Sequence, residues 1–275
     1  MIYNIIEMFS YPFMQRAVIV GILVALCSSL LGTSLVLKRY SMIGDGLSHM
    51  GFAALAIAYA LNLAPLVVAI PVCVIAAFLL LGMNENSKIK GDAATALMCS
   101  GALAVGVMTV SLTTGMNTDV CNYMFGSILA MSQSDVRISV VLSIAVIILF
   151  VAFYPRIFAV TFDENFARAT GTNSSLYNMI IALLTAVTVV LGMRMMGTLL
   201  ISSLIVFPSL SAMRVCRRFK TVVISSVCIS VICFCVGIYI SYEYSTPTGA
   251  SIVIINIVVF LVLSFISKIR EKVAV

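Results

Sequence analysis

The chain has 275 residues, of which 62% are hydrophobic and only 9% are charged, and its formal net charge is +6. A soluble domain usually carries about 25% charged residues, so this chain has too little polar surface to cover a water-soluble globule. Its apolar runs are long enough to cross a bilayer as helices, which satisfy their backbone hydrogen bonds internally. The composition therefore predicts an all-α, polytopic transmembrane helical bundle that occupies residues 1–275 as a single domain, with no nucleic-acid partner.

Nine apolar segments are expected to span the membrane, each separated from the next by polar or charged residues. In chain order they are Ala17–Leu37, Leu47–Asn62, Pro65–Gly82, Ala93–Thr114, Ile138–Tyr154, Asn178–Met193, Thr198–Met213, Val222–Tyr242 and Ser251–Ser267. Two pairs of small residues inside them, Ser28 with Gly32 and Ala102 with Gly106, are spaced four positions apart. Small residues at this spacing let another helix approach closely.

The remaining segments fix the expected topology. Val120–Met131 is too short to cross the bilayer and is expected to be re-entrant. Arg156–Leu176 is expected to be a polar loop. If the basic stretch Arg214–Lys220 is cytoplasmic, thirteen of the sixteen lysines and arginines fall on that side, and only Arg16, Arg137 and Arg194 do not. The positive-inside rule then places the N-terminus outside and the C-terminus inside.

The only histidine, His49, stands four positions after Asp45 at the start of the second segment. Residues at this spacing share one face of a helix, and a carboxylate with an imidazole suits zinc or manganese. A charged aspartate inside lipid costs roughly 2.5–3.5 kcal/mol, so it is seldom there without a function. Spacing alone leaves an alternative open, in which Asp45 caps the helix and His49 is an ordinary helical residue. Two ligands make an incomplete site, which suits an ion that must leave again.

Asp163–Gly171 has acidic residues first, an arginine near its end and a final glycine, which is the order that a short helix prefers. Two interpretations remain open for it, a solvated surface helix or a helix that docks on a cytoplasmic partner.

The other candidate ligands are interpreted as packing residues. The eight cysteines are scattered through apolar runs without a Cys-x-x-Cys pair, and Met193, Met195 and Met196 cluster beside Arg194. The chain has no phosphate-binding loop and no nucleophile–base arrangement, so it is not expected to be an enzyme. If ATP supplies energy, a separate subunit must hydrolyse it.

Five motifs occur in the order found in one transporter family, and together they cover nearly the whole chain. They are Phe13–Ala17, Gly44–His49, Phe125–Ala130, Phe162–Gly171 and Gly197–Leu200 through Phe207–Pro208. On these motifs the chain resembles the permease subunits of bacterial zinc and manganese ABC importers, a family that also includes iron transporters. Such permeases are similar to type II importers.

The resemblance implies a multi-pass permease of the bacterial plasma membrane that works with a second copy of itself. A cytoplasmic ATPase dimer and an extracytoplasmic metal-binding protein would be its partners, and the transported zinc or manganese its only metal. Asp45 and His49 would touch the ion in the pathway. Family members often have alanine at the positions of Gly46 and Met50, where this chain departs. The coupling helix that receives the ATPase stroke would contain Asp163, Glu164, Phe166, Ala167, Arg168 and Gly171.

Three functions are therefore considered. The first is an ATP-driven importer of a divalent transition metal, with zinc or manganese as the expected cargo and iron as the alternative. The second is a gradient-driven secondary carrier or channel, in which His49 would titrate in the working pH range. The third is a membrane scaffold that carries no metal. Proton relays usually use several ionisable groups inside the membrane, and this chain has few, so the importer is favoured over the carrier.

Overall fold

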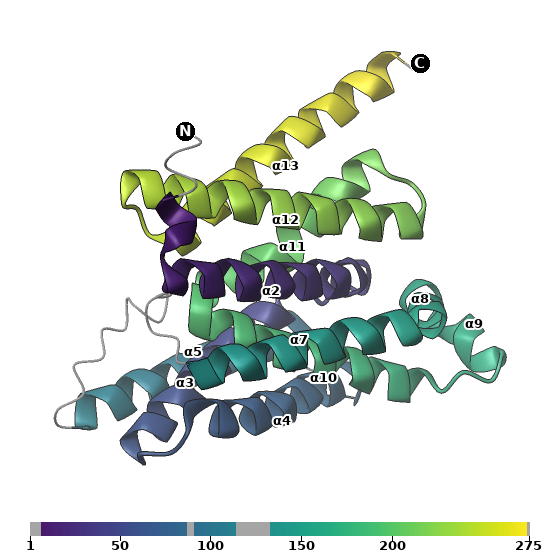
Figure 1. Ribbon diagram of the computed structural model, residues 1–275. Coiled ribbons are helices and arrows are strands. Elements are labelled where there is room, and N and C mark those ends of the chain that lie inside the picture. Colours follow the sequence, from purple (N-terminus) through teal and green to yellow (C-terminus); the bar gives the residue numbers. More distant parts are fainter. Residues whose placement is uncertain (1–6, 87–90, 114–132, 274–275) are drawn as a thin grey trace.

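The structure is a computed structural model that describes residues 7–86, 91–113 and 133–273. Within these residues all regular secondary structure is α-helical, which confirms the predicted all-α fold. Nine of the described helices have 18 residues or more and form the bundle (Figure 1). They are α2 (Pro12–Leu37), α3 (Ile43–Ala60), α4 (Pro65–Asn86), α5 (Gly91–Leu112), α7 (Gln133–Ala152), α10 (Ser174–Met196), α11 (Thr198–Val215), α12 (Phe219–Tyr244) and α13 (Thr248–Val273).

Each of the nine predicted spans coincides with one long helix, and eight of these helices are long and apolar enough to cross a membrane. The helix outside this group is α3, whose 18 residues include Asp45 and His49 near its start. These two polar side chains lower the mean hydropathy of a helix that is otherwise built from apolar and small residues. The re-entrant segment predicted at Val120–Met131 lies outside the described residues.

The sequence predicted a polar loop at Arg156–Leu176. This prediction is wrong, because much of the segment is helical. Helix α8 (Tyr154–Phe162) begins with Pro155 in its first turn, and helix α9 (Glu164–Ala169) follows it directly. Proline is well suited to a first turn, where its missing N–H needs no partner and its φ is already helical. Pro155 therefore starts a helix at the position where the sequence predicted the beginning of a loop.

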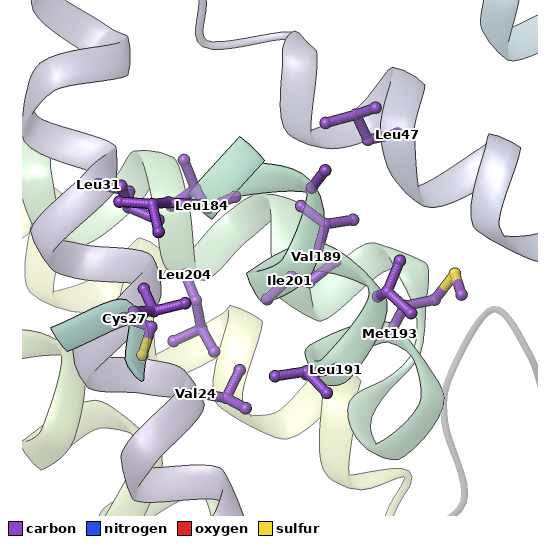
Figure 2. Packing of buried hydrophobic residues seen from close by; sticks show 14 of the residues in the cluster. Val24, Cys27, Leu31, Leu47, Leu184, Val189, Leu191, Met193, Ile201 and Leu204 are labelled. Atoms are coloured by element: carbon purple, nitrogen blue, oxygen red, sulfur yellow. The ribbon is translucent and has the colours of Figure 1, made fainter. Parts of the chain in front are cut away.

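Helices α2 and α10 form the centre of the bundle. In their most apolar stretches 72% of the residues are buried, compared with 22% in α5 and α13. Figure 2 shows the core that they share with α11, to which α2 contributes Val24 and Leu31, α10 contributes Leu191 and α11 contributes Leu204. Large apolar side chains also cover the outside of the peripheral helices, as at Leu261 of α13. Such a surface is suited to lipid.

Small and polar residues bring the central helices close together. At Gly32 of α2 an added Cβ atom would lie 2.0 Å from the carbonyl oxygen of Ile205 in α11, and at Gly106 of α5 it would lie 2.4 Å from the ring of Phe52 in α3. Hydroxyl groups add hydrogen bonds between α12 and α2, such as that from Ser230 Oγ to the carbonyl oxygen of Ala25 at 3.1 Å. The close helix approaches predicted from the two small-residue pairs are confirmed at both glycines.

Candidate metal site and coupling helix

Asp45 lies in the first turn of α3 but does not cap that helix. The N-cap residue is Met42, and no side chain caps this end. The alternative in which Asp45 caps the helix is therefore wrong. The Asp45 carboxylate instead faces two neighbouring helices: Ser202 Oγ of α11 lies 3.5 Å from Oδ1, and Cys99 Sγ of α5 lies 3.7 Å from Oδ2.

The two glycines that flank Asp45 make this arrangement possible. An added Cβ atom at Gly44 would lie 3.0 Å from Ile205 Cδ1 of α11, and one at Gly46 would lie 3.1 Å from Thr95 Cγ2 of α5. Both distances are tighter than ordinary van der Waals contact. Each glycine therefore lets one helix approach α3, and Asp45 lies between the two approaches.

His49 shares one face of α3 with Asp45, as the spacing predicted. Its Nε2 atom lies 3.8 Å from Asp45 Oδ1, and the side chains of His49 and Asp45 are 17% and 38% exposed. One ligand atom from each of Asp45, His49 and Cys99 lies within 4.8 Å of the others, so the three side chains can hold one metal ion. Among the described residues, this is the only such group of three or more His, Cys, Asp or Glu side chains.

Cys99 is the residue that sequence reasoning missed. It lies far from Asp45 in the chain and on a different helix, and no spacing pattern connects the two. The interpretation of the cysteines as packing residues fits Cys27, Cys73 and Cys233, which are buried in the bundle. Cys99 is only partly buried, and its thiol is directed at a carboxylate.

The candidate site lies where α3 meets α5 and α11, because the Asp45 carboxylate faces Cys99 of α5 and Ser202 of α11. Helix α10 contacts the chain on both sides of this site. Near one end of α10, Asn178 accepts a hydrogen bond from Lys38, which follows α2. Near the other end, about 22 Å along the helix, Met193 packs against Gly51 of α3, where an added Cβ atom would lie 2.6 Å from the methionine methyl group. Met193 is buried against α3, in keeping with its interpretation as a packing residue.

The predicted short helix is present as α9, with the termination signals expected from the sequence. Asp163 is its N-cap, and its Oδ1 atom accepts a hydrogen bond at 2.9 Å from the backbone N–H of Phe166. Gly171 follows the helix with a φ of +83°, which glycine adopts without strain. Ala167 is buried beneath the helix, whereas Phe166 is 63% exposed. An exposed aromatic ring on a well-anchored short helix is suited to contact with a partner.

Charged side chains fix α9 to two central helices. Glu164 lies 3.6 Å from Lys38 Nζ, which joins α9 to the end of α2, and Glu164 Oε1 also accepts a hydrogen bond from Arg168 at 2.7 Å. Arg168 Nε in turn donates to Ser174 Oγ at the start of α10, at 2.6 Å. Burial alone would raise the pKa of Glu164, but the charge of Lys38 and hydrogen bonds from Asn178, Arg168 and Ser174 together hold this pKa below its ordinary value of 4.5.

A second charged pair lies at the opposite end of α10 from Lys38. Arg194 Nη2 in its last turn lies 2.9 Å from Asp135 Oδ2 in the first turn of α7, and the two side chains are only 15% and 11% exposed. The sequence marked Arg194 as one of three basic residues outside the cytoplasmic group, but it gave no indication of the partner. This pair is well separated along α10 from the contacts of α9.

Eight helices that are long and apolar enough to cross a membrane define a multi-pass membrane protein. The family model described as the ABC 3 transport family matches residues 10–267, and the chain belongs to this family. It is accordingly a multi-pass transport permease of the bacterial inner membrane. Of the three functions considered from the sequence, the family selects the ABC transporter.

Similar proteins support this assignment along nearly the whole chain. The manganese import system permease protein ScaB of Streptococcus gordonii is 28% identical, over 94% of this chain and 92% of its own. The high-affinity zinc uptake system membrane protein ZnuB of Haemophilus influenzae is 27% identical, over 90% of this chain and 95% of its own. The structure of PsaBC from Streptococcus pneumoniae in complex with Fab superposes with a TM-score of 0.85 at 27% identity, covering 96% of this chain and 95% of that chain.

Proposed function

We propose that this permease moves a divalent transition-metal ion, zinc or manganese, into the cytoplasm, and that Asp45 and His49 bind the ion in transit. The observation that carries the proposal is the position of this pair inside the bundle of an ABC 3 family permease, with Oδ1 and Nε2 separated by 3.8 Å. A carboxylate and an imidazole are ligands that these two metals share. The names of the relatives ScaB and ZnuB support the same two cargoes.

The proposed assembly contains two copies of the chain, a cytoplasmic ATPase dimer and an extracytoplasmic metal-binding protein. The chain acts as one permease domain over residues 1–275, and the family match over residues 10–267 supports this. ATP hydrolysis belongs to the partner ATPase, and the permease itself needs no permanently bound cofactor. The lysines and arginines that follow α2 and α11 face the cytoplasm together with α9.

In the proposed mechanism α9 is the coupling helix. It contains Glu164, Phe166, Ala167 and Arg168, with Asp163 as its N-cap and Gly171 directly after its C-cap. Phe166 is exposed and would contact the ATPase. Glu164 and Arg168 join α9 to α2 through Lys38 and to α10 through Ser174, and both of these helices pack in the centre of the bundle. A movement of α9 therefore reaches α10, which packs against α3 at Gly51, and α2, which packs against α11 at Gly32. Because the site offers few ligands, the ion can leave it again.

The test is metal accumulation in cells that lack their own importers. The chain is expressed with its ATPase and binding protein, and zinc and manganese are offered in competition. We expect uptake that disappears when the ATPase is inactivated. His49→Ala should abolish most uptake without changing the amount of protein in the membrane, whereas Met50→Leu, at the next position of α3, should leave uptake unchanged.

Two results would contradict the proposal in different ways. Uptake that persists with an inactive ATPase would indicate a gradient-driven carrier and would remove α9 from its proposed role. Wild-type uptake by His49→Ala would exclude His49 as a ligand of the transported ion.

A further inference from the structure

The metal site has a third side chain, Cys99, which comes from a different helix. Its Sγ atom lies 3.7 Å from Asp45 Oδ2, and one ligand atom from each of Asp45, His49 and Cys99 lies within 4.8 Å of the other two. We propose that Cys99 is a ligand of the transported ion and that it makes the site select zinc over manganese. This inference rests on the proposed function, in which Asp45 and His49 bind the ion in transit.

The three ligand atoms can be drawn into a tetrahedral zinc site by side-chain rotation. Zinc binds sulfur at about 2.3 Å and nitrogen or oxygen at about 2.0–2.2 Å, so neighbouring ligand atoms of a tetrahedron lie roughly 3.3–3.7 Å apart. In the metal-free chain Cys99 Sγ lies 3.7 Å from Asp45 Oδ2 and His49 Nε2 lies 3.8 Å from Asp45 Oδ1, and one atom from each side chain lies within 4.8 Å of the other two. The side chains therefore have to approach one another by about 1 Å at most to reach the distances of a zinc site. Three protein ligands leave the fourth position open for water, through which the ion can be exchanged.

The packing of α5 against α3 places Cys99 in this position. Thr95 and Cys99 lie one turn apart on α5, and both face Gly46, where an added Cβ atom would lie 3.1 Å from Thr95 Cγ2 and 4.0 Å from Cys99 Sγ. The absence of a side chain at Gly46 thus allows the close approach that brings the thiol to Asp45. Cys99 remains partly accessible, whereas Cys73, which faces the same helix α3 from α4, is fully buried.

A thiol ligand changes which metal the site prefers. Oxygen ligands suit manganese, imidazole suits zinc among others, and thiolate ligands select softer metals such as zinc. Manganese also lies at the weak end of the general affinity order for divalent metals, so added sulfur widens its disadvantage. In the metal-free chain the Cys99 thiol is directed at Asp45 Oδ2. When zinc binds, the thiol proton passes to solvent and the thiolate coordinates the ion.

The experiment compares the wild-type chain with Cys99→Ser, which replaces sulfur by oxygen. The matched control is Cys228→Ser, which removes an exposed cysteine of α12 that is far from the site in the chain. The complete transporter, with its ATPase and binding protein, is reconstituted in vesicles, and radioactive zinc and manganese are supplied together. We expect Cys99→Ser to lower the ratio of zinc to manganese uptake by about tenfold or more, since even residues that only support a ligand contribute that much to metal affinity. Cys228→Ser should keep the wild-type ratio.

A second measurement does not depend on transport. The purified wild-type permease is treated with N-ethylmaleimide, and modification of Cys99 is followed by mass spectrometry with zinc, with manganese and without metal. Zinc should protect Cys99 much more than manganese does, and cadmium should produce the ultraviolet absorbance of a metal–thiolate bond that Cys99→Ser lacks. An unchanged uptake ratio in Cys99→Ser, or equal alkylation of Cys99 with and without zinc, would overturn the inference.

The two levels of the proposal fail in distinguishable ways. If the wild-type transporter shows no ATPase-dependent uptake of either metal, the proposed function fails. If uptake depends on the ATPase and on His49 but its selectivity ignores Cys99, the importer stands and only the third ligand is wrong.

Discussion

Replacing Arg194 by methionine should destabilise the permease strongly. The Arg194 guanidinium lies 2.9 Å from the Asp135 carboxylate, both side chains are at least 85% buried, and Arg194 Nη1 is itself buried without a hydrogen-bond partner in the described part of the chain. Breaking a buried pair by removing one member costs about 3–5 kcal/mol, because the remaining buried charge loses the attraction of its partner. We therefore expect Arg194→Met to lower the folding equilibrium constant roughly 10²- to 10⁴-fold.

The assay is reversible unfolding of the purified permease in mixed micelles by increasing concentrations of a denaturing detergent. Arg137→Met is a matched control, because Arg137 lies two residues from Asp135 on α7 but is exposed, so its loss should change the free energy of unfolding by no more than about 0.5 kcal/mol. The double variant Arg194→Met with Asp135→Asn removes both charges and should recover much of the lost stability. The reasoning is refuted if Arg194→Met behaves like Arg137→Met, or if the double variant is less stable than Arg194→Met alone.

Two further predictions test the helix packing and the attachment of α9. Gly32→Ala should lower the free energy of unfolding by about 3 kcal/mol, at the upper end for overpacking, because its Cβ atom would lie 2.0 Å from a backbone oxygen. The control is Gly101→Ala, where no atom lies within 4 Å of the added Cβ atom. It should be neutral or stabilising by about 0.5–1 kcal/mol in the same assay. Glu164→Lys should reduce ATP-dependent uptake while membrane insertion is retained, because it places a positive charge beside Lys38 and Arg168; unchanged uptake and unchanged copurification with the ATPase would contradict it. The pKa of Glu164 is below its ordinary value of 4.5 in the folded chain, so its ion pairs contribute fully to stability above pH 4.5. This contribution is lost only as the pH falls through the lower pKa of the folded chain. Glu164→Gln at neutral pH should therefore have the same effect on this contact as strong acid.

Much of the fold could be predicted because the composition of a lipid-embedded helix is so strongly constrained. Apolar runs located all nine long helices within the described residues. The exact helix ends could not be read from hydropathy, since a helix follows backbone hydrogen bonds and continues beyond the apolar run. Helix α13, for example, extends to Val273 through Lys268 and Arg270. Proline was ambiguous for the same reason, and Pro155 starts α8 where the pattern suggested a loop.

The local parts of the candidate site were predictable, and the long-range parts were not. His49 lies on one turn with Asp45 because helix geometry alone fixes residues four apart. The caps of α9 followed in the same way from Asp163 and Gly171. Cys99 reaches Asp45 only because α5 packs on α3 at Gly46, and a single sequence does not show which helices are neighbours.

The division of the ligands between two helices connects metal affinity to helix packing. Asp45 and His49 belong to one turn of α3 and keep their separation whenever that helix moves as a unit. Cys99 belongs to α5, so a shift of α5 away from Gly46 would draw its sulfur away from Asp45 and from an ion held there. Under the proposed mechanism, a bundle that rearranges with the ATPase cycle can thus hold zinc with three ligands and release it with two. The same argument gives a prediction for Gly46→Ala, which separates α3 from α5 at Thr95 and Cys99. This variant keeps the Cys99 thiol, but its ratio of zinc to manganese uptake should resemble that of Cys99→Ser.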